Sequence, residues 1–219
     1  CATGGISAGG DRRNRGGWGY FSATRRPEDG YARTSTTVWQ VMALESAKIS
    51  GIEVPDGALD DARRFLRGMF DQRLGAFLYN KDQSRLSSSW PTLPASTPAA
   101  VFCLLLLGDD ADDERIQAGL RFTLQRRPKA WREASQDAFV LRAEGHPYFW
   151  YCGSLACFLA GGDAWQQWNE ALKQVFLPAQ NRDGSFTPIG AYAEYADDRP
   201  EHAAFTTALA VLSLEVYYR

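Results

Sequence analysis

The sequence lacks three features that would each assign it to a class of protein. Its 24 basic and 26 acidic residues nearly cancel, for a formal net charge of -2, so there is no basic excess on which a dedicated nucleic-acid binder would depend. Its longest apolar run, residues 99–107, is well short of the roughly 18 residues that span a bilayer. We therefore expect neither a nucleic-acid partner nor a membrane span.

Cysteine is also scarce. Four cysteines in 219 residues do not make a disulfide framework in a chain of this length. Three of them, Cys103, Cys152 and Cys157, lie in apolar runs, where a thiol behaves as a small hydrophobic side chain. This pattern favours a reducing compartment, and hence a cytoplasmic location, while leaving a processed or exported parent protein open.

The most informative feature is a turn that recurs along the chain. QNRDGSF at 180–186 has relatives in QRLGAF at 72–77, QRRPKAW at 125–131 and GGW at 16–18. The pattern is typical of a helix that ends, reverses over a tight turn and places an aromatic side chain on the next layer. A fixed period indicates a repeat architecture, in which we expect the aromatic residues to act as turn plugs. These plugs, spaced 59, 54 and 55 positions apart, are Trp18, Phe77, Trp131 and Phe186.

Each interval between plugs holds one strongly apolar run and one amphipathic run. The apolar runs cover residues 34–50, 99–107, 148–160 and 203–217. The amphipathic runs follow positions 55, 113 and 161. The repeating unit is therefore expected to be a helical hairpin, and residues 135–142 are a candidate for one further short helix.

These two kinds of helix differ in how much of their surface must be covered. An apolar helix has to be buried on nearly all sides, whereas an amphipathic helix is buried on one. We therefore predict an all-α fold, an α/α toroid with an inner ring of apolar helices and an outer ring of amphipathic helices. Residues 1–33 would form a Gly- and Arg-rich loop region with the first plug, and residues 34–219 a single domain of toroid repeats. We expect this ring to be incomplete and the chain to be the C-terminal part of a larger protein.

The glutamine, glycine and aromatic pattern of QNRDGSF and QRLGAF, with Lys129 at the glycine position of QRRPKAW, resembles the repeat of squalene and terpenoid cyclases and protein prenyltransferases. The resemblance covers the chain from about residue 16 to its end. It implies an α/α barrel whose inner helix ends form a cavity, closed by more hairpins than this chain supplies. Upstream hairpins of the same parent protein, or a second subunit, are therefore expected to cover an open flank near Val38–Leu44.

The catalytic signatures of this resemblance are absent or displaced. The proton-donating DxDD motif of the cyclases has a counterpart in Asp110–Asp113, but this DADD sequence lies just ahead of an amphipathic helix, where carboxylates cap helix ends. A zinc site like that of the prenyltransferases would draw on Cys152, Cys157, His146 and His202, and no pair of these shows a short ligand spacing. We predict no catalytic residue, no metal and no cofactor.

An aromatic cluster remains at the expected mouth of the ring. Its rings could stack on an isoprenoid, a sugar or a peptide, although core and plug positions would use the same residue types. We therefore expect a non-catalytic binding or scaffold module with an aromatic-rich cavity mouth. The alternative is an enzyme that acts on an isoprenoid or polysaccharide, with acids from upstream hairpins or from the loop residues Asp137, Glu144, Glu194 and Asp197. The candidate ligand contacts are Tyr148, Phe149, Trp150, Tyr151, Tyr192, Tyr195 and Phe205.

Overall fold

The computed structural model describes residues 15–20, 32–80, 93–189 and 200–218, and the fold is all-α, as predicted. The helices are α1 (Thr34–Ile49), α2 (Ala58–Gly68), α3 (Ser96–Leu106), α4 (Glu114–Gln125), α5 (Gln136–Arg142), α6 (Pro147–Ala160), α7 (Gly162–Ala179) and α8 (Pro200–Leu214), followed by a short 3-10 helix (Glu215–Tyr218). Two strands of two residues each, β1 (Phe70–Asp71) and β2 (Ala76–Phe77), pair in antiparallel fashion. None of the helices in the described part has the length and hydrophobicity needed to cross a membrane.

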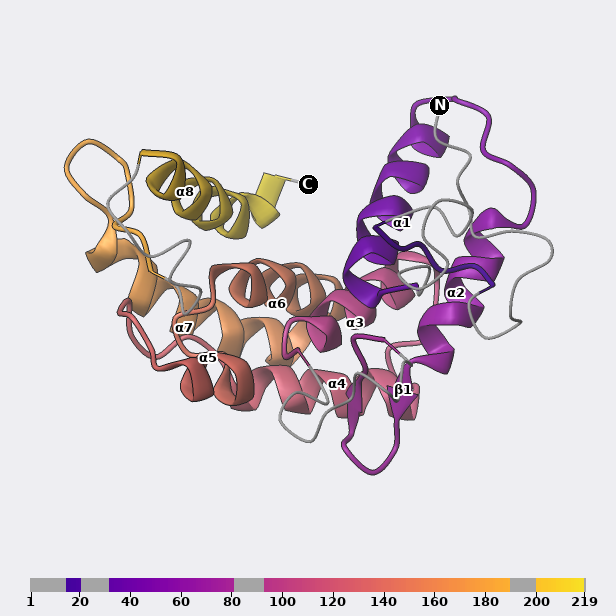
Figure 1. Ribbon diagram of the computed structural model, residues 1–219, viewed down its shortest axis with the longest axis horizontal. Helices are drawn as coiled ribbons and strands as arrows, with labels where there is room; N and C mark the ends of the chain where they lie inside the picture. The colour runs from indigo at the N-terminus through magenta and orange to yellow at the C-terminus, as the bar shows by residue number, and fades with distance from the viewer. Residues whose placement is uncertain (1–14, 21–31, 81–92, 190–199, 219) are drawn as a thin grey trace.

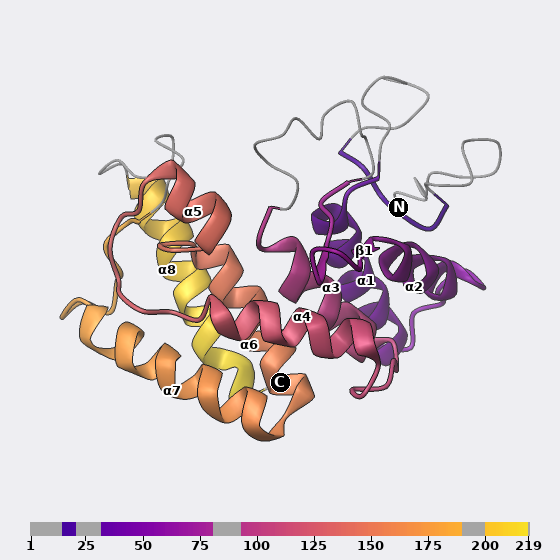
Figure 2. The ribbon, with the colours of Figure 1, turned by 90° about the horizontal axis from the view of Figure 1, so that it is seen from below.

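The helices form two curved layers (Figure 1). The apolar helices α1, α3, α6 and α8 follow one another along the concave side, and each contacts the next. The amphipathic helices α2, α4 and α7 lie on the convex side, and Figure 2 shows α4 and α7 from below. α2 packs against α1 and α3, α4 against α3, and α7 against α6. This arrangement follows from the sequence, because only the apolar helices need neighbours on several sides.

The most deeply buried part of the molecule is the contact between α3 and α6. Every residue of α3 from Ser96 to Leu104 is buried, and so is every residue of α6 from Phe149 to Cys157. Two glycines allow the outer helices α4 and α7 to pack closely against the inner helices α3 and α6. A Cβ atom at Gly119 of α4 would lie 2.4 Å from Val101, and one at Gly153 of α6 would lie 2.3 Å from the Trp168 ring of α7. These two positions therefore accept glycine alone without movement of a neighbour.

The recurrent turns share a hydrogen bond that the sequence analysis did not anticipate. The backbone amide of a plug donates to a threonine hydroxyl in the following apolar helix, over 2.9 Å for Trp18 and 3.0 Å for Phe77 and Phe186. The accepting residues, 19, 20 and 21 positions further on, are Thr37 of α1, Thr97 of α3 and Thr207 of α8. Trp131 has no such bond in the part of the chain that the structure describes. The third turn therefore differs from the other three in structure as well as in sequence.

The apolar helices at the two ends of the array leave part of their surface accessible, as expected for the first and last helices of an inner layer. On α8, Phe205 and Val211 are 48% and 38% exposed. On the flank of α1 near Val38–Leu44, Val38 and Val41 are buried against the chain's own residues, whereas Trp39 is 45% exposed. Coverage of these side chains by further hairpins or a second subunit stays a prediction.

A candidate ligand pocket at the ends of the apolar helices

A pocket of about 350 Å³ lies where the N-terminal parts of the four apolar helices converge. Ser35 comes from α1, Ser96 from α3, Tyr148 from α6 and Phe205 from α8. This volume falls within the range of small-molecule sites, roughly 300 to 1,000 Å³. Two more lining residues are helical, Phe139 of α5 and Pro147 at the start of α6. The others come from the turns and connections that precede the apolar helices: Tyr20, Tyr79, Leu93, Ala95, His146 and Ile189.

The walls of the pocket are neutral. None of the described residues that line it has a carboxylate, a guanidinium or an ammonium group. Tyr20 and Tyr79 face each other, with their hydroxyl oxygens 3.3 Å apart, and the Arg33 guanidinium lies over both rings, 5.2 and 5.9 Å from their centroids. Burial, followed by the hydrogen bond with Tyr20, raises the pKa of Tyr79 to about 12, so this phenol stays protonated.

His146 supplies an imidazole to the wall and is held in its neutral form. It is the N-cap of α6: its Nδ1 accepts a hydrogen bond from the backbone amide of Phe149 over 3.2 Å. Its ring stacks on Phe139 with centroids 3.9 Å apart. Burial lowers the pKa of His146 to about 3. Because Nδ1 accepts, the proton of the neutral imidazole lies on Nε2.

Two hydroxyl groups in the wall lack hydrogen-bond partners among the described residues. The hydroxyls of Ser35 and Tyr148 are buried and make no hydrogen bond of normal geometry there, although the Ser35 hydroxyl lies near the Tyr79 side chain. The Tyr148 ring is stacked against Trp39, with centroids 6.3 Å apart, and its hydroxyl lies beside the Cys152 thiol. Buried polar groups are normally paired, because leaving one unpaired costs about 1–3 kcal/mol. Both oxygens have almost no accessible surface, so a small movement of their side chains would be needed to bring them into contact with a ligand.

The structure separates the predicted cavity residues into three groups. Tyr148 and Phe205 line the pocket. Phe149, Trp150 and Tyr151 are at most 2% exposed and belong to the core, since successive helical residues point in different directions. Tyr192 and Tyr195 lie outside the described residues.

Sequence reasoning missed the contribution of the turns to the pocket. Tyr20 and Tyr79 each lie two residues after a plug, and Ile189 lies three residues after Phe186. This spacing is the signal that could have found them, because residues just beyond a plug lead from the turn toward the start of the next apolar helix.

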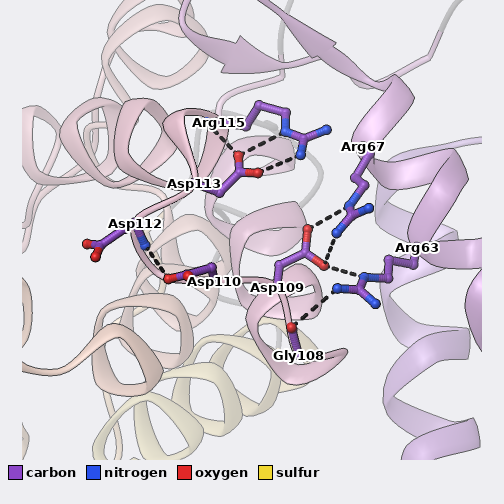
Figure 3. Close-up of polar contacts among 8 residues, drawn as sticks. All are labelled: Arg63, Arg67, Gly108, Asp109, Asp110, Asp112, Asp113 and Arg115. Carbon is purple, nitrogen blue, oxygen red and sulfur yellow. Dashed lines mark hydrogen bonds and ion pairs between the residues drawn. The ribbon is translucent and has the colours of Figure 1, made fainter.

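The DADD sequence lies at the start of α4 (Figure 3) and none of its residues lines the pocket. Asp113 is the N-cap of α4 and accepts from the amide of Arg115 over 2.9 Å, while the Asp110 carboxylate accepts from the amide of Asp112 over 2.9 Å. Hydrogen bonding to the Arg115 side chain lowers the pKa of Asp113 to about 2. The capping interpretation is therefore correct, with Asp113 as the cap and Asp110 in the preceding turn.

A buried ion cluster lies next to this sequence (Figure 3). The Asp109 side chain is 1% exposed and bonds to Arg63 and Arg67 of α2, at 2.8 and 3.0 Å in the case of Arg67. Arg63 also donates to the carbonyl oxygen of Gly108 over 3.2 Å. The cluster joins the outer helix α2 to the connection between α3 and α4.

The remaining acid and metal candidates do not converge on the pocket. Asp137 is exposed and Glu144 is bonded to Arg142, and neither lines the pocket. Glu194 and Asp197 lie outside the described residues. Within the described ranges, no three His, Cys, Asp or Glu side chains are grouped closely enough to hold a metal ion. Comparison with known proteins gives no match to a family model, to a curated protein or to a solved structure.

Proposed function

We propose that this chain is a non-catalytic binding module that holds a neutral, largely apolar molecule in the pocket at the ends of its apolar helices. The observation that carries the proposal is the pocket itself: about 350 Å³, aromatic, and without a charged side chain among its described lining residues. A charged ligand would lose hydration there without gaining a partner. An apolar ligand would gain contact with several rings.

The polar atoms of the pocket define the functional groups of the ligand. The buried hydroxyls of Ser35 and Tyr148 and the Nε2–H of His146 would donate to hydroxyl or carbonyl oxygens. α1 and α3 begin without a side-chain cap, so their N-terminal dipoles also favour an electronegative ligand atom. These features support an isoprenoid-like molecule with an alcohol or ketone group as the preferred ligand.

We also propose that the two curved layers are a segment of an α/α toroid like that of terpenoid cyclases and prenyltransferases. The alternation of apolar and amphipathic helices and the repeated bond from plug to threonine support this proposal. Further hairpins of the same parent protein, or a second subunit, would then cover the accessible apolar side chains at the two ends of the array. At α1 this is Trp39, and at α8 these are Phe205 and Val211.

The proposal is tested by titrating the full chain with farnesol and following binding by tryptophan fluorescence and calorimetry. Farnesoic acid, a charged analogue, and cellotriose, a neutral sugar, serve as comparison ligands. We expect saturable binding of farnesol and weaker binding of both comparison ligands. No saturable binding of farnesol, or tighter binding of the acid, would contradict the proposed ligand class.

A pair of variants on α8 connects the binding to the pocket. Phe205→Lys places a charge in the pocket wall at an exposed position, whereas Val211→Lys makes the same change on α8 outside the wall. Loss of one aromatic wall contact should weaken farnesol binding about tenfold or more in Phe205→Lys. Val211→Lys should bind like the unmodified chain. Equal affinities of the two variants would place the ligand elsewhere.

A further inference from the structure

A second, smaller cavity of about 60 Å³ lies among the C-terminal end of α4, the turn that follows it, α5 and the start of α6. Trp150 of α6 and Gly145 form part of its wall. Its charged lining residues are mainly basic, with one acid among them: Arg126, Arg127, Lys129, Arg132, Arg142 and Glu144.

Most of this positive charge has no anionic partner. Glu144 is engaged by Arg142, whose Nε lies 2.7 Å from its carboxylate. In the part of the chain that the structure describes, no carboxylate forms an ion pair with the other four basic residues. Glu144 also lies close enough to Lys129 and Arg132 for their charges to lower its pKa. Five basic side chains against one acid still leave the wall with a net positive charge, which a bound anion would stabilise.

Arg126 is held by two carbonyl oxygens and an aromatic ring. Its guanidinium donates to the carbonyl oxygens of Leu141 over 3.1 Å and Phe122 over 3.2 Å, and lies 3.6 Å from the centroid of the Phe122 ring. Burial lowers the pKa of Arg126, which means that its charge has lost hydration without gaining a carboxylate. The carbonyl oxygens hold the planar group in place, so it is already oriented when a ligand arrives.

An unpaired donor lies in the same wall. The Trp150 side chain is 1% exposed, and its ring is fixed by Trp131 and Phe176 at 5.5 and 5.4 Å between centroids. Its Nε1–H is buried and has no hydrogen-bond partner among the described residues. The indoles of Trp131 and Trp168 do find acceptors, each over 3.0 Å, in Thr187 and Ser154. Since this atom has almost no accessible surface, a small shift of the indole would bring its N–H within reach of an acceptor in the cavity.

The cavity coincides with the one repeat turn that departs from the pattern. QRRPKAW has Lys129 where the related turns have glycine, and its plug Trp131 lacks the described bond to a threonine. The loop after α5 completes the wall, and a Cβ atom at Gly145 would lie 2.6 Å from the carbonyl oxygen of Arg132. The divergent sequence of this turn thus supplies the basic groups, and the glycine allows the loop to close on it.

We propose that this cavity is a binding site for a phosphate group. The excess of basic over acidic side chains in the wall is larger than a singly charged carboxylate would balance, whereas a phosphate monoester carries up to two charges and three terminal oxygens. Guanidinium groups bind such oxygens in pairs, and one further oxygen would accept from the Trp150 indole. Two kinds of ligand carry this group: inorganic phosphate and a phosphorylated molecule.

The site is tested with the full chain by NMR, following the indole N–H signal of Trp150, which is assigned with Trp150→Phe. Sodium phosphate, phenyl phosphate and sodium acetate are titrated at constant ionic strength and about pH 7.5, where phosphate monoesters carry close to two charges. We expect a saturable shift with a phosphate compound and none with acetate. Tighter binding of phenyl phosphate identifies a phosphorylated ligand, and equal or tighter binding of sodium phosphate identifies the free ion.

Matched double variants separate a specific site from general attraction to positive charge. Lys129→Met with Arg132→Met removes two lining cations, and Arg121→Met with Lys173→Met removes two exposed cations that do not line the cavity. The first pair should raise the dissociation constant at least about tenfold, and the second should leave it within about twofold. Equal effects of the two pairs, or the absence of a saturable shift with either phosphate compound, would overturn the proposal.

Discussion

Lowering the pH from 7 to 5 should destabilise this protein, and His146 should account for about 2 kcal/mol of the loss. Its pKa falls from 6.5 to about 3 on folding, because burial disfavours the charged imidazole. The unfolded chain therefore binds a proton at His146 below about pH 6.5, while the folded chain stays neutral until about pH 3. Since the unfolded state binds more protons in this window, the contribution is present above pH 6.5 and is lost as the pH falls toward 3.

The size of the effect follows from the two pKa values. A difference of one unit corresponds to about 1.4 kcal/mol, so the loss between pH 7 and pH 5 amounts to about 2 kcal/mol. Urea unfolding at both pH values, followed by tryptophan fluorescence, measures it directly. Above pH 5 most carboxylates in both states remain ionised, which keeps their contribution small.

The matched variant is His146→Asn. Asparagine retains a side-chain acceptor for the amide of Phe149 at the N-cap but does not titrate. The loss of stability between pH 7 and pH 5 should therefore be smaller by about 2 kcal/mol in this variant. His202→Asn removes the second histidine of the sequence and measures its contribution separately. An equal loss in the unmodified chain and in His146→Asn would refute the reasoning.

Two further substitutions test the packing between layers. Asp109→Asn should lower the free energy of unfolding by about 3 kcal/mol, because it leaves two arginines of α2 without their buried carboxylate. The neighbouring Asp110→Asn, at an exposed position, should change it by less than about 0.5 kcal/mol, and equal urea midpoints for the two variants would contradict this account. Gly153→Ala should cost about 1–3 kcal/mol, because its Cβ would lie 2.3 Å from the Trp168 ring. An unchanged melting temperature of Gly153→Ala would contradict this, because it would mean that α6 and α7 can move apart without loss of stability.

The helices could be predicted because their patterns differ in kind. Residues 148–160 are apolar on every side and form most of α6, while the one-sided run from 162 to 180 forms α7. The start of α3 was harder to predict, since Ser96 and Thr97 are polar yet buried. Thr97 lies inside the molecule because its hydroxyl accepts the amide of Phe77, a pairing 20 residues apart that no local pattern reveals.

The pocket was predictable only in part, because its location depends on several helices at once. An aromatic run at 148–151 indicated the right end of α6, but a helix turns each successive side chain to a new direction, so Tyr148 alone of the four lines the pocket. His146 was considered as a metal ligand, whereas its ring caps a helix and stacks on Phe139. The basic cavity joins residues 126–132 to 142–150. Its charges are visible in the sequence, but their convergence is not.

Two consecutive residues, Gly145 and His146, border different cavities: the first faces the basic one and the second the aromatic one. The peptide bond between them therefore connects the walls of the two cavities. An isotope label on that amide would be placed to respond to a ligand in either cavity. A methyl group added at Gly145 would lie 2.6 Å from the carbonyl oxygen of Arg132, which lines the basic cavity, and would strain a backbone with a positive φ.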